Sequence, residues 1–308
     1  RTRKSLFSSR SIFFAGSASL IYLLLSYLLI GFKTDQLVLV AFFNTMYFAS
    51  GSTRRFILGF SIFIFYWIVF DYMKAFPNYR FNQVHIASLY HAEKAVFGIA
   101  ENARLLTPNE FFAGHASTPI DLLAGFFYLC WVPVPLAFAA AMFFKNRNAF
   151  FQFALTFFLV NLLGFVGYYL YPAAPPWYVA NYGFGFHPQT PGNTAGLGRF
   201  DAFFGISVFK NLYAKSSNVF AAMPSLHASY MLIVLYYGLK FRLKAWNILF
   251  AVIMLGIWFT AVYSGHHYVL DVMAGISCAI LGIVLFQWWI KTEAGSRFLQ
   301  SLLKLTDA

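Results

Sequence analysis

Residues 265–290 read GHHYVLDVMAGISCAILGIVLFQWWI, and this stretch decides the fold. After its two histidines it contains a single charged side chain, Asp271, in an otherwise uncharged and mostly apolar run. About 20 such residues are what an α-helix needs to cross the hydrocarbon core of a bilayer. The stretch therefore predicts a membrane-spanning helix whose first turn lies beside a pair of histidines.

The rest of the chain has the same character, with 60% hydrophobic, 21% aromatic and only 10% charged residues. This composition excludes an ordinary soluble domain. We predict an all-α, polytopic membrane helical bundle of about eight spans. Segment 35–53 carries Asn44, so a tilted or re-entrant element is an alternative there. The spans are expected at residues 11–32, 35–53, 56–72, 119–144, 148–171, 224–240, 245–263 and 268–290.

The net charge of +12 is explained by membrane topology rather than by nucleic acid. With a cytoplasmic N-terminus, the cytoplasmic segments carry 14 of the 22 Lys and Arg residues and two of the 10 acidic ones. The positive-inside rule favours this orientation, and basic edges suit anionic lipid head groups. These basic residues are Arg1, Arg3, Lys4, Arg10, Arg54, Arg55, Lys145, Arg147, Lys240, Arg242, Lys244, Lys291, Arg297 and Lys304. The seven histidines then lie at or near the opposite face, at His85, His91, His115, His187, His227, His266 and His267.

Loop lengths divide the chain into three parts. N-terminal membrane helices are expected in 1–55 and a cytoplasmic tail in 293–308, with the remaining spans in 56–292. Two long segments, 73–118 and 172–223, interrupt the spans at the outer face.

The N-terminal basic residues resemble the start of a signal peptide. The apolar run after them is too long for a cleaved one and continues into further spans, so we expect a retained anchor. Cys130 and Cys278 lie far apart in predicted spans. We therefore expect neither a disulfide framework nor a thiolate metal site.

The first outer segment contains an amphipathic stretch between Ile86 and Leu105. Apolar residues gather near one face, whereas Glu93, Lys94 and Arg104 occupy much of the rest. This pattern predicts a helix that lies on the outer leaflet or packs on the protein's own spans.

The second outer segment opens with Tyr171-Pro172-Ala173-Ala174-Pro175-Pro176-Trp177-Tyr178. Its three prolines are expected to end the fifth span and to hold the chain extended. We expect Trp177 at interfacial depth, where amphipathic rings are favoured. A glycine-rich stretch then leads to Arg199-Phe200-Asp201.

Two spans begin at the outer face with a histidine motif, MPSLHAS at 223–229 and GHHYVLD at 265–271. Two helix N-termini at one depth aim unpaired N–H groups at one place, which predicts an anion site with Ser225 as a further donor. His267 and Asp271 are spaced to meet on one helix face. A carboxylate on one imidazole nitrogen leaves the other free as a nucleophile. His227, from the other helix, is suited to act as general acid.

Simpler interpretations exist for each residue. A lone histidine at a membrane interface is often a polar anchor, and a His–Asp spacing of four occurs by chance on many helices. Asp271 favours function, because an ionisable group inside an apolar run costs about 3 kcal/mol. A metal site built from His227, His266, His267 and Asp271 is a further alternative, although no dedicated zinc motif is present.

These motifs resemble those of the type 2 phosphatidic acid phosphatase superfamily. More narrowly, Pro-Ser-Leu-His at 224–227, His-His-Tyr-x-x-Asp at 266–271 and the proline turn at 171–177 are similar to the inositol phosphorylceramide synthase branch. Residues 196–201, Gly-Leu-Gly-Arg-Phe-Asp, are similar to its bacterial members. The resemblance covers about 107–290.

The resemblance implies a six-helix catalytic core formed by spans three to eight, preceded by two extra helices. It implies that His267 is the nucleophile, that Asp271 orients it and that His227 is the acid and base, without a metal or other cofactor. Synthases of this branch move phosphoinositol from phosphatidylinositol to a ceramide hydroxyl and release diacylglycerol.

The chain departs from the superfamily's phosphatases, which carry a Lys, an Arg-Pro pair and a Ser-Arg pair around phosphate. Tyr171-Pro172 and Thr260-Ala261 stand at the corresponding places. A weaker cationic clamp suits a phosphodiester better than a monoester, whose charge is about −2. The candidate replacements are His266, Arg199, Lys210 and Lys215, with Tyr171 and Trp177 as further substrate-binding candidates.

We therefore predict a membrane lipid phosphotransferase that works through a phosphohistidine, with phosphatidylinositol and ceramide as substrates. One alternative is a lipid phosphatase of the same fold, acting for example on phosphatidylinositol phosphate. A second is a non-catalytic lipid carrier or scramblase. The expected location is a bacterial inner membrane with the site facing the periplasm, or the lumen in a eukaryote.

Overall fold

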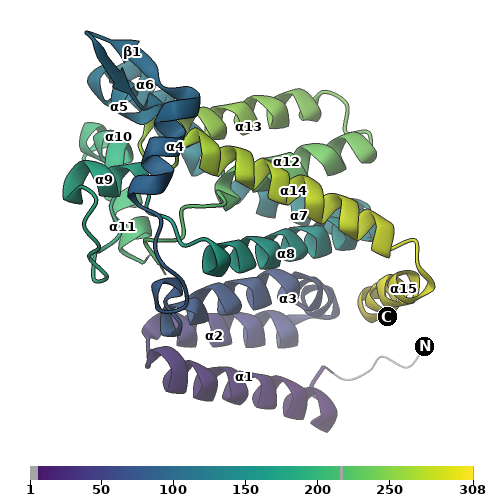
Figure 1. The fold of residues 1–308 in the computed structure, drawn as a ribbon. Helices are drawn as coiled ribbons and strands as arrows, with labels where there is room; N and C mark the ends of the chain where they lie inside the picture. Colours follow the sequence, from purple (N-terminus) through teal and green to yellow (C-terminus); the bar gives the residue numbers. More distant parts are fainter. Residues whose placement is uncertain (1–5, 216–217, 308) are drawn as a thin grey trace.

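The protein is described by a computed structural model that covers residues 6–215 and 218–307. The predicted cytoplasmic residues Arg1, Arg3 and Lys4 lie outside the described residues. Nearly all regular structure is helical, which confirms the predicted all-α membrane bundle (Figure 1). The long helices are α1 (Ser9–Ile30), α2 (Thr34–Ala49), α3 (Gly51–Tyr72), α6 (Thr118–Leu129), α7 (Pro133–Lys145), α8 (Arg147–Leu170), α12 (Leu226–Lys240), α13 (Trp246–Tyr263), α14 (Val269–Trp289) and α15 (Glu293–Asp307).

Within the described residues, six helical segments are long and apolar enough to cross a membrane. They are α1, α3 with the short helix after it, α6 with α7, α8, α13 and α14. The predicted spans 35–53 and 224–240 correspond to α2 and α12, which have only 16 and 15 residues. Both pack along longer helices, α2 on α3 and α12 on α13. The chain is therefore an integral, multi-pass membrane protein.

The predicted single span 119–144 is interrupted between Leu129 and Pro133. Proline has no N–H to donate, so Pro133 cannot continue the hydrogen bonds of α6 and instead begins α7, where a missing N–H costs nothing. The interruption places Trp131 with its ring centroid 4.4 Å from that of His227, edge to face. Trp131, in the break between the helices, thus packs against His227 of the predicted site.

Helices α12 and α14 approach so closely that their backbones contact each other. The Ser225 N–H donates to the Asp271 carbonyl at 2.9 Å, and the Ser229 hydroxyl donates to the Gly275 carbonyl at 2.7 Å. A Cβ on Gly275 would lie 2.0 Å from the Ser225 carbonyl oxygen, so only glycine fits. This contact holds the starts of the two histidine-bearing helices together.

An outer layer covers the end of the bundle opposite α15 (Figure 1). The predicted amphipathic helix ends at Phe97, and Leu105 lies instead in a short β-hairpin, so the prediction was wrong beyond that residue. The layer consists of α4 (Ala87–Phe97), β1 (Ile99–Glu101), β2 (Arg104–Leu106), α5 (Pro108–Gly114), α9 (Pro176–Tyr182), α10 (Gly198–Phe204), α11 (Val208–Ala214) and 3₁₀ turns at Met73–Ala75, Asn78–Arg80 and Ala195–Leu197.

The proline turn after α8 is extended, as predicted, and connects three parts of the outer layer. Ala173 forms isolated bridges to both His85 and Ala221. Pro176 then occupies the first turn of α9, where a missing N–H costs nothing. Trp177, expected at interfacial depth, is 8% exposed, so its ring packs against protein.

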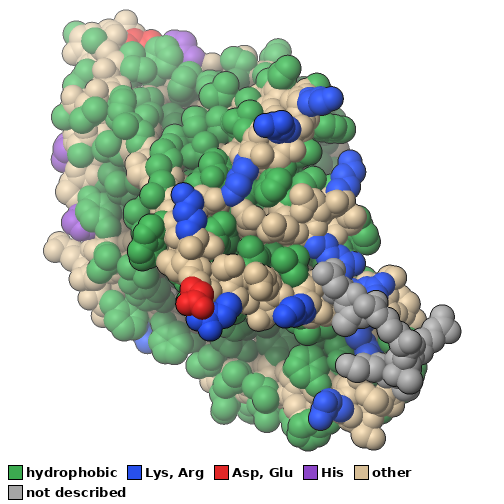
Figure 2. Space-filling view, turned by 90° about the vertical axis from the view of Figure 1, so that its right-hand side faces the viewer, with side chains coloured by type: hydrophobic (Ala, Val, Ile, Leu, Met, Phe, Trp, Pro, Cys, Tyr) green, Lys and Arg blue, Asp and Glu red, His purple; other side chains and the backbone are tan. Residues whose placement is uncertain are grey.

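The opposite end of the bundle is basic. Figure 2 shows Lys and Arg side chains gathered on the face that carries α15, with few acidic side chains among them. The predicted tail is the helix α15, which packs against α3 and α8. The arrangement agrees with the charge asymmetry read from the sequence.

We predict that Gly275→Ala lowers the stability of the protein by about 1–3 kcal/mol, because the added methyl group overpacks the α12–α14 contact. Thermal unfolding in detergent measures this effect. Gly16→Ala in α1 is the matched control, since a Cβ there meets nothing within 4 Å. Equal unfolding midpoints for the two variants would contradict the role assigned to Gly275.

Candidate active site

Two histidines from different helices meet at the outer end of the bundle. His227 lies in the first turn of α12, and His267 lies two residues before α14. Nδ1 of His227 is 3.2 Å from Nε2 of His267, within hydrogen-bond distance. His267 is 6% exposed, and His227 is partly exposed. The structure therefore brings together the two imidazoles that the sequence assigned to one reaction.

Asp271 lies on the far side of His267 and is fully buried. Its Oδ2 is 3.6 Å from Nδ1 of His267 and accepts a hydrogen bond from the Tyr268 N–H at 2.8 Å. A carboxylate beside Nδ1 favours the proton on that nitrogen, so Nε2 is an acceptor and His227 donates to it. This tautomer leaves the nucleophilic lone pair of His267 facing His227.

The loop before α14 is fixed by hydrogen bonds to its backbone. The N–H groups of His266 and His267 both donate to the Ala261 carbonyl, at 3.1 and 2.9 Å. The side-chain amide of Asn109, on α5, donates to the carbonyls of Val262 and His267 at 2.7 and 2.9 Å. These contacts hold the His267 ring in position without using its nitrogens.

Glu93 is a functional candidate that the sequence prediction missed. It is fully buried, and its two oxygens accept hydrogen bonds from the N–H groups of Val269 and Leu270 at 2.9 and 3.0 Å. Burial raises the pKa of its carboxyl, while the two N–H donors act in the opposite direction. Its spacing of four from the buried Leu89 was the available signal, because it places Glu93 on the apolar face of α4.

The contacts of Glu93 change the prediction of an anion site at the start of α14. The first N–H groups of α14 were expected to bind phosphate, but they already bind a carboxylate of the protein. A helix N-terminus favours negative charge, and here α4 supplies it. The start of α14 is therefore anchored to the outer layer.

Ser225 and His266 lie close to the histidine pair in the sequence but have different surroundings. The Ser225 hydroxyl is buried and has no hydrogen-bond partner among the described residues. Nε2 of His266 is 2.9 Å from the Thr194 carbonyl, and its ring stacks on Tyr213 at 4.3 Å. Burial lowers the pKa of His266 to about 3, so this ring is neutral at physiological pH and supplies no cation for phosphate.

Arg199 is held by an acidic partner on another helix. Its Nε donates to Oδ1 of Asp121 at 2.7 Å, and the Tyr263 hydroxyl donates to the same oxygen at 2.8 Å. Gly196 allows this approach, since a Cβ there would lie 2.9 Å from the Ser264 Cα and 3.0 Å from Nη2 of Arg199. The ion pair largely neutralises the cation.

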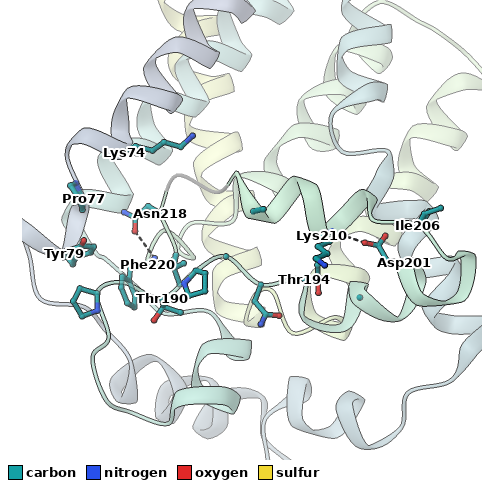
Figure 3. A pocket seen from close by; sticks show the side chains of 17 residues that line it. Lys74, Pro77, Tyr79, Thr190, Thr194, Asp201, Ile206, Lys210, Asn218 and Phe220 are labelled. Atoms are coloured by element: carbon teal, nitrogen blue, oxygen red, sulfur yellow. Dashed lines mark hydrogen bonds between the residues drawn. The ribbon is translucent and has the colours of Figure 1, made fainter. Parts of the chain in front are cut away.

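Of the remaining predicted residues, Lys210 and Lys215 are not brought to the histidines, whereas Tyr171 and Trp177 lie near the loop that carries them. Lys210 is exposed and lines a separate cavity between α11, the loop around Thr190 and the end of α3 (Figure 3). Lys215 pairs with Asp35 at 2.8 Å on the surface. The Tyr171 ring stacks on His85 at 3.8 Å. The backbone N–H of Trp177 donates to the Gly265 carbonyl at 2.9 Å, beside the histidine loop.

Aromatic side chains enclose His227. Besides Trp131, the Tyr128 ring lies 5.3 Å from it, and Tyr230 stacks on Trp131 at 5.8 Å. Across the part of the chain that the structure describes, no group of three or more His, Cys, Asp or Glu side chains is arranged to hold a metal ion. The site therefore places two enclosed imidazoles beside a buried carboxylate.

Comparison with known proteins assigns the same region to one family. The family model of the PAP2 superfamily matches residues 89–285. The chain is 47% identical over 279 residues to the phosphoinositol dihydroceramide synthase of Bacteroides thetaiotaomicron, which covers 90% of this chain and 92% of that protein. It is 35% identical over 132 residues to the inositol phosphorylceramide synthase catalytic subunit AUR1 of Saccharomyces cerevisiae, covering 42% of this chain and 31% of that one. No solved structure matches.

We predict that Glu93→Gln lowers the free energy of unfolding by about 1.5–3 kcal/mol, because charge-assisted hydrogen bonds to a buried helix end are lost. The same variant should lower kcat, since the start of α14 carries His267 and Asp271. Glu293→Gln is the matched control, because Glu293 forms only an exposed pair with Arg297. An unfolding midpoint and kcat equal to those of the control would remove the anchoring role of Glu93.

Proposed function

The chain belongs to the PAP2 superfamily, the type 2 phosphatidic acid phosphatase superfamily that its histidine motifs resemble, and from this premise we propose that it transfers phosphoinositol between lipids. The donor is phosphatidylinositol and the acceptor is the hydroxyl of a ceramide or dihydroceramide. The observation that carries the proposal is the arrangement of three side chains: His227 contacts His267, and His267 lies beside Asp271. The name and 47% identity of the Bacteroides relative support the choice of lipids.

In the first half-reaction, Nε2 of His267 attacks phosphorus and the bond from phosphorus to the diacylglycerol oxygen breaks. The leaving oxygen takes a proton from the imidazolium form of His227, which the negative charge of the bound phosphodiester favours. Asp271 stabilises the positive charge that develops on the His267 ring. The product is a phosphoinositol group on Nε2 of His267, and diacylglycerol departs.

In the second half-reaction, neutral His227 accepts the proton of the acceptor hydroxyl. The oxygen attacks phosphorus, the bond from phosphorus to Nε2 of His267 breaks, and His227 regains its proton. Phosphorus must lie between the two imidazoles, so the 3.2 Å hydrogen bond between them opens when the donor binds. The two rings then face opposite sides of the phosphorus, as an in-line displacement requires.

Two features support transfer over hydrolysis. Arg199, which lines a cavity together with Ser264 and Gly265 at the histidine loop, is neutralised by Asp121, which suits a singly charged diester better than a monoester. The histidines are also enclosed by Tyr128, Trp131 and the bundle, which limits the access of water to the intermediate.

We further propose that residues 56–292 are the catalytic core and that the site faces the periplasm. The site lies at the end of the bundle opposite the basic face, and the positive-inside rule puts that face in the cytoplasm. The donor and acceptor then reach the histidines from the outer leaflet.

We predict that His267→Ala abolishes transfer of a labelled head group from phosphatidylinositol to ceramide by purified protein. His115→Ala, which changes only an exposed histidine paired with Glu101, should retain activity and is the matched control. Transfer that survives His267→Ala would remove the phosphohistidine mechanism, and movement of intact lipids without a labelled sphingolipid product would favour a lipid carrier. Release of free phosphate from a monoester such as phosphatidylinositol phosphate would favour the phosphatase.

We also predict that wild type given labelled phosphatidylinositol without an acceptor forms a labelled phosphohistidine, and that His227→Ala forms it more slowly, because the acid of the first half-reaction is missing. Acid-labile, base-stable label on the protein measures the intermediate. Wild type and His227→Ala should each form the same amount of label with and without excess chelator, since the proposed steps require no metal. Label that is equally absent from wild type and His227→Ala would contradict the covalent mechanism.

A further inference from the structure

A cavity of about 690 Å³ lies between the N-terminal helices, α3 and α11. α1 and α2 lie at the edge of the bundle and contact it mainly through α3 (Figure 1). Beside the turn at Ser50, α2 and α3 pack closely, and Tyr47 and Ile57 are buried there in one apolar cluster. Toward the outer end of the bundle, both helices line the cavity instead.

The half of the cavity wall that lies deeper in the membrane is apolar. Leu39 and Phe42 of α2 line it, and so do Trp67 and Phe70 of α3. In each pair the residues are three apart and share one face of the helix. Water finds no hydrogen-bond partners on such a wall, and an empty space leaves the wall without dispersion contacts. An acyl chain of the surrounding bilayer is therefore the occupant that suits this half.

The other half of the wall is charged and lies toward the outer layer. Asp35 stands about 10 Å from Phe42 along α2, because a helix rises about 1.5 Å per residue. The same spacing of seven residues separates Lys74 from Trp67. Lys74 also lines the polar cavity of the outer layer shown in Figure 3. The charged residues that line this half are Lys33, Asp35, Asp71, Lys74 and Lys215. Charged and apolar groups thus follow one another along the helices, as the head group and chains of a lipid do.

The balance of these charges favours an anion. Three lysines and two aspartates give this half of the wall a net charge of +1. Lys215 pairs with Asp35 at 2.8 Å, and Lys74 pairs with Asp71 at 2.5 Å. Lys33 is exposed and forms no ion pair among the described residues. A lysine at a membrane surface attracts anionic lipid, so Lys33 is suited to the phosphate of a lipid that carries one negative charge.

We infer that this cavity binds an anionic phospholipid of the outer leaflet, with an acyl chain against Phe42 and Trp67 and the phosphate beside Lys33. Neither His227 nor His267 lines the cavity, so this lipid is not the one that reacts. It fills the space between the N-terminal helices and the core instead. Such a lipid is bound whether or not the protein transfers phosphoinositol.

Quenching of tryptophan fluorescence by brominated lipids tests the site, because Trp67 lies in its wall. The whole protein is placed in vesicles of equal amounts of anionic phosphatidylglycerol and zwitterionic phosphatidylcholine, with bromine on the acyl chains of one or the other. The signal of Trp67 is the difference between wild type and Trp67→Phe. We expect phosphatidylglycerol to occupy the place beside Trp67 about five times as often as phosphatidylcholine, the effect of one lysine near an anionic lipid.

Three variants locate the source of this preference. Lys33→Gln should lower it about fivefold, so that the two lipids quench Trp67 almost equally. Arg104→Gln removes the same charge from the hairpin on the opposite side of the outer layer and should keep the preference (Figure 1). Trp288 is the matched tryptophan, because it is 67% exposed at the far end of α14. Its signal, measured with Trp288→Phe, should not respond to Lys33→Gln.

Equal quenching of Trp67 by the two brominated lipids in wild type, or a preference that survives Lys33→Gln, would overturn the anionic-lipid site. Quenching of Trp67 by neither lipid would overturn it as well, and is the result expected if a second copy of the chain covers the cavity. No outcome depends on transfer, because neither phosphatidylinositol nor ceramide is present.

Discussion

The site depends on the close backbone contact between α12 and α14. Because Gly275 has no side chain, the Ser225 backbone approaches α14, and its N–H binds the carbonyl of Asp271. Two helices in lipid gain little from hydrophobic association, so small residues and hydrogen bonds at their interface determine how they pack. Here that packing sets the distance between His227 and His267, and with it the place where phosphorus can be held.

Residues of the outer layer bind polar groups around this contact. Glu93 of α4 binds the positive end of α14, and Asn109 of α5 ties the histidine loop. Arg199 of α10 pairs in turn with Asp121 of the membrane helix α6. A buried charge without a partner is costly in a low-dielectric environment. The outer layer is therefore part of the catalytic framework, and the membrane helices alone would leave its charges unpaired.

The sequence predicted the helical bundle, the three residues His227, His267 and Asp271, and the concentration of basic residues on one face, because span length, helical spacing and charge asymmetry are local patterns. It did not predict the break at Pro133, the hairpin after Phe97 or the burial of Trp177. Those depend on which distant segments pack together. Glu93 was missed for the same reason: its partners, Val269 and Leu270, lie about 176 residues away along the chain.

The hydrogen bond between His227 and His267 makes each ring a competitor of the substrate. In the resting protein the lone pair of the proposed nucleophile is occupied by the imidazole that we propose as the acid. A phosphate ester must displace that contact before it can react, and a small anion offers little binding energy with which to do so. A lipid donor gains that energy from its acyl chains and its head group together. This difference gives a physical reason why soluble phosphate esters are not attacked.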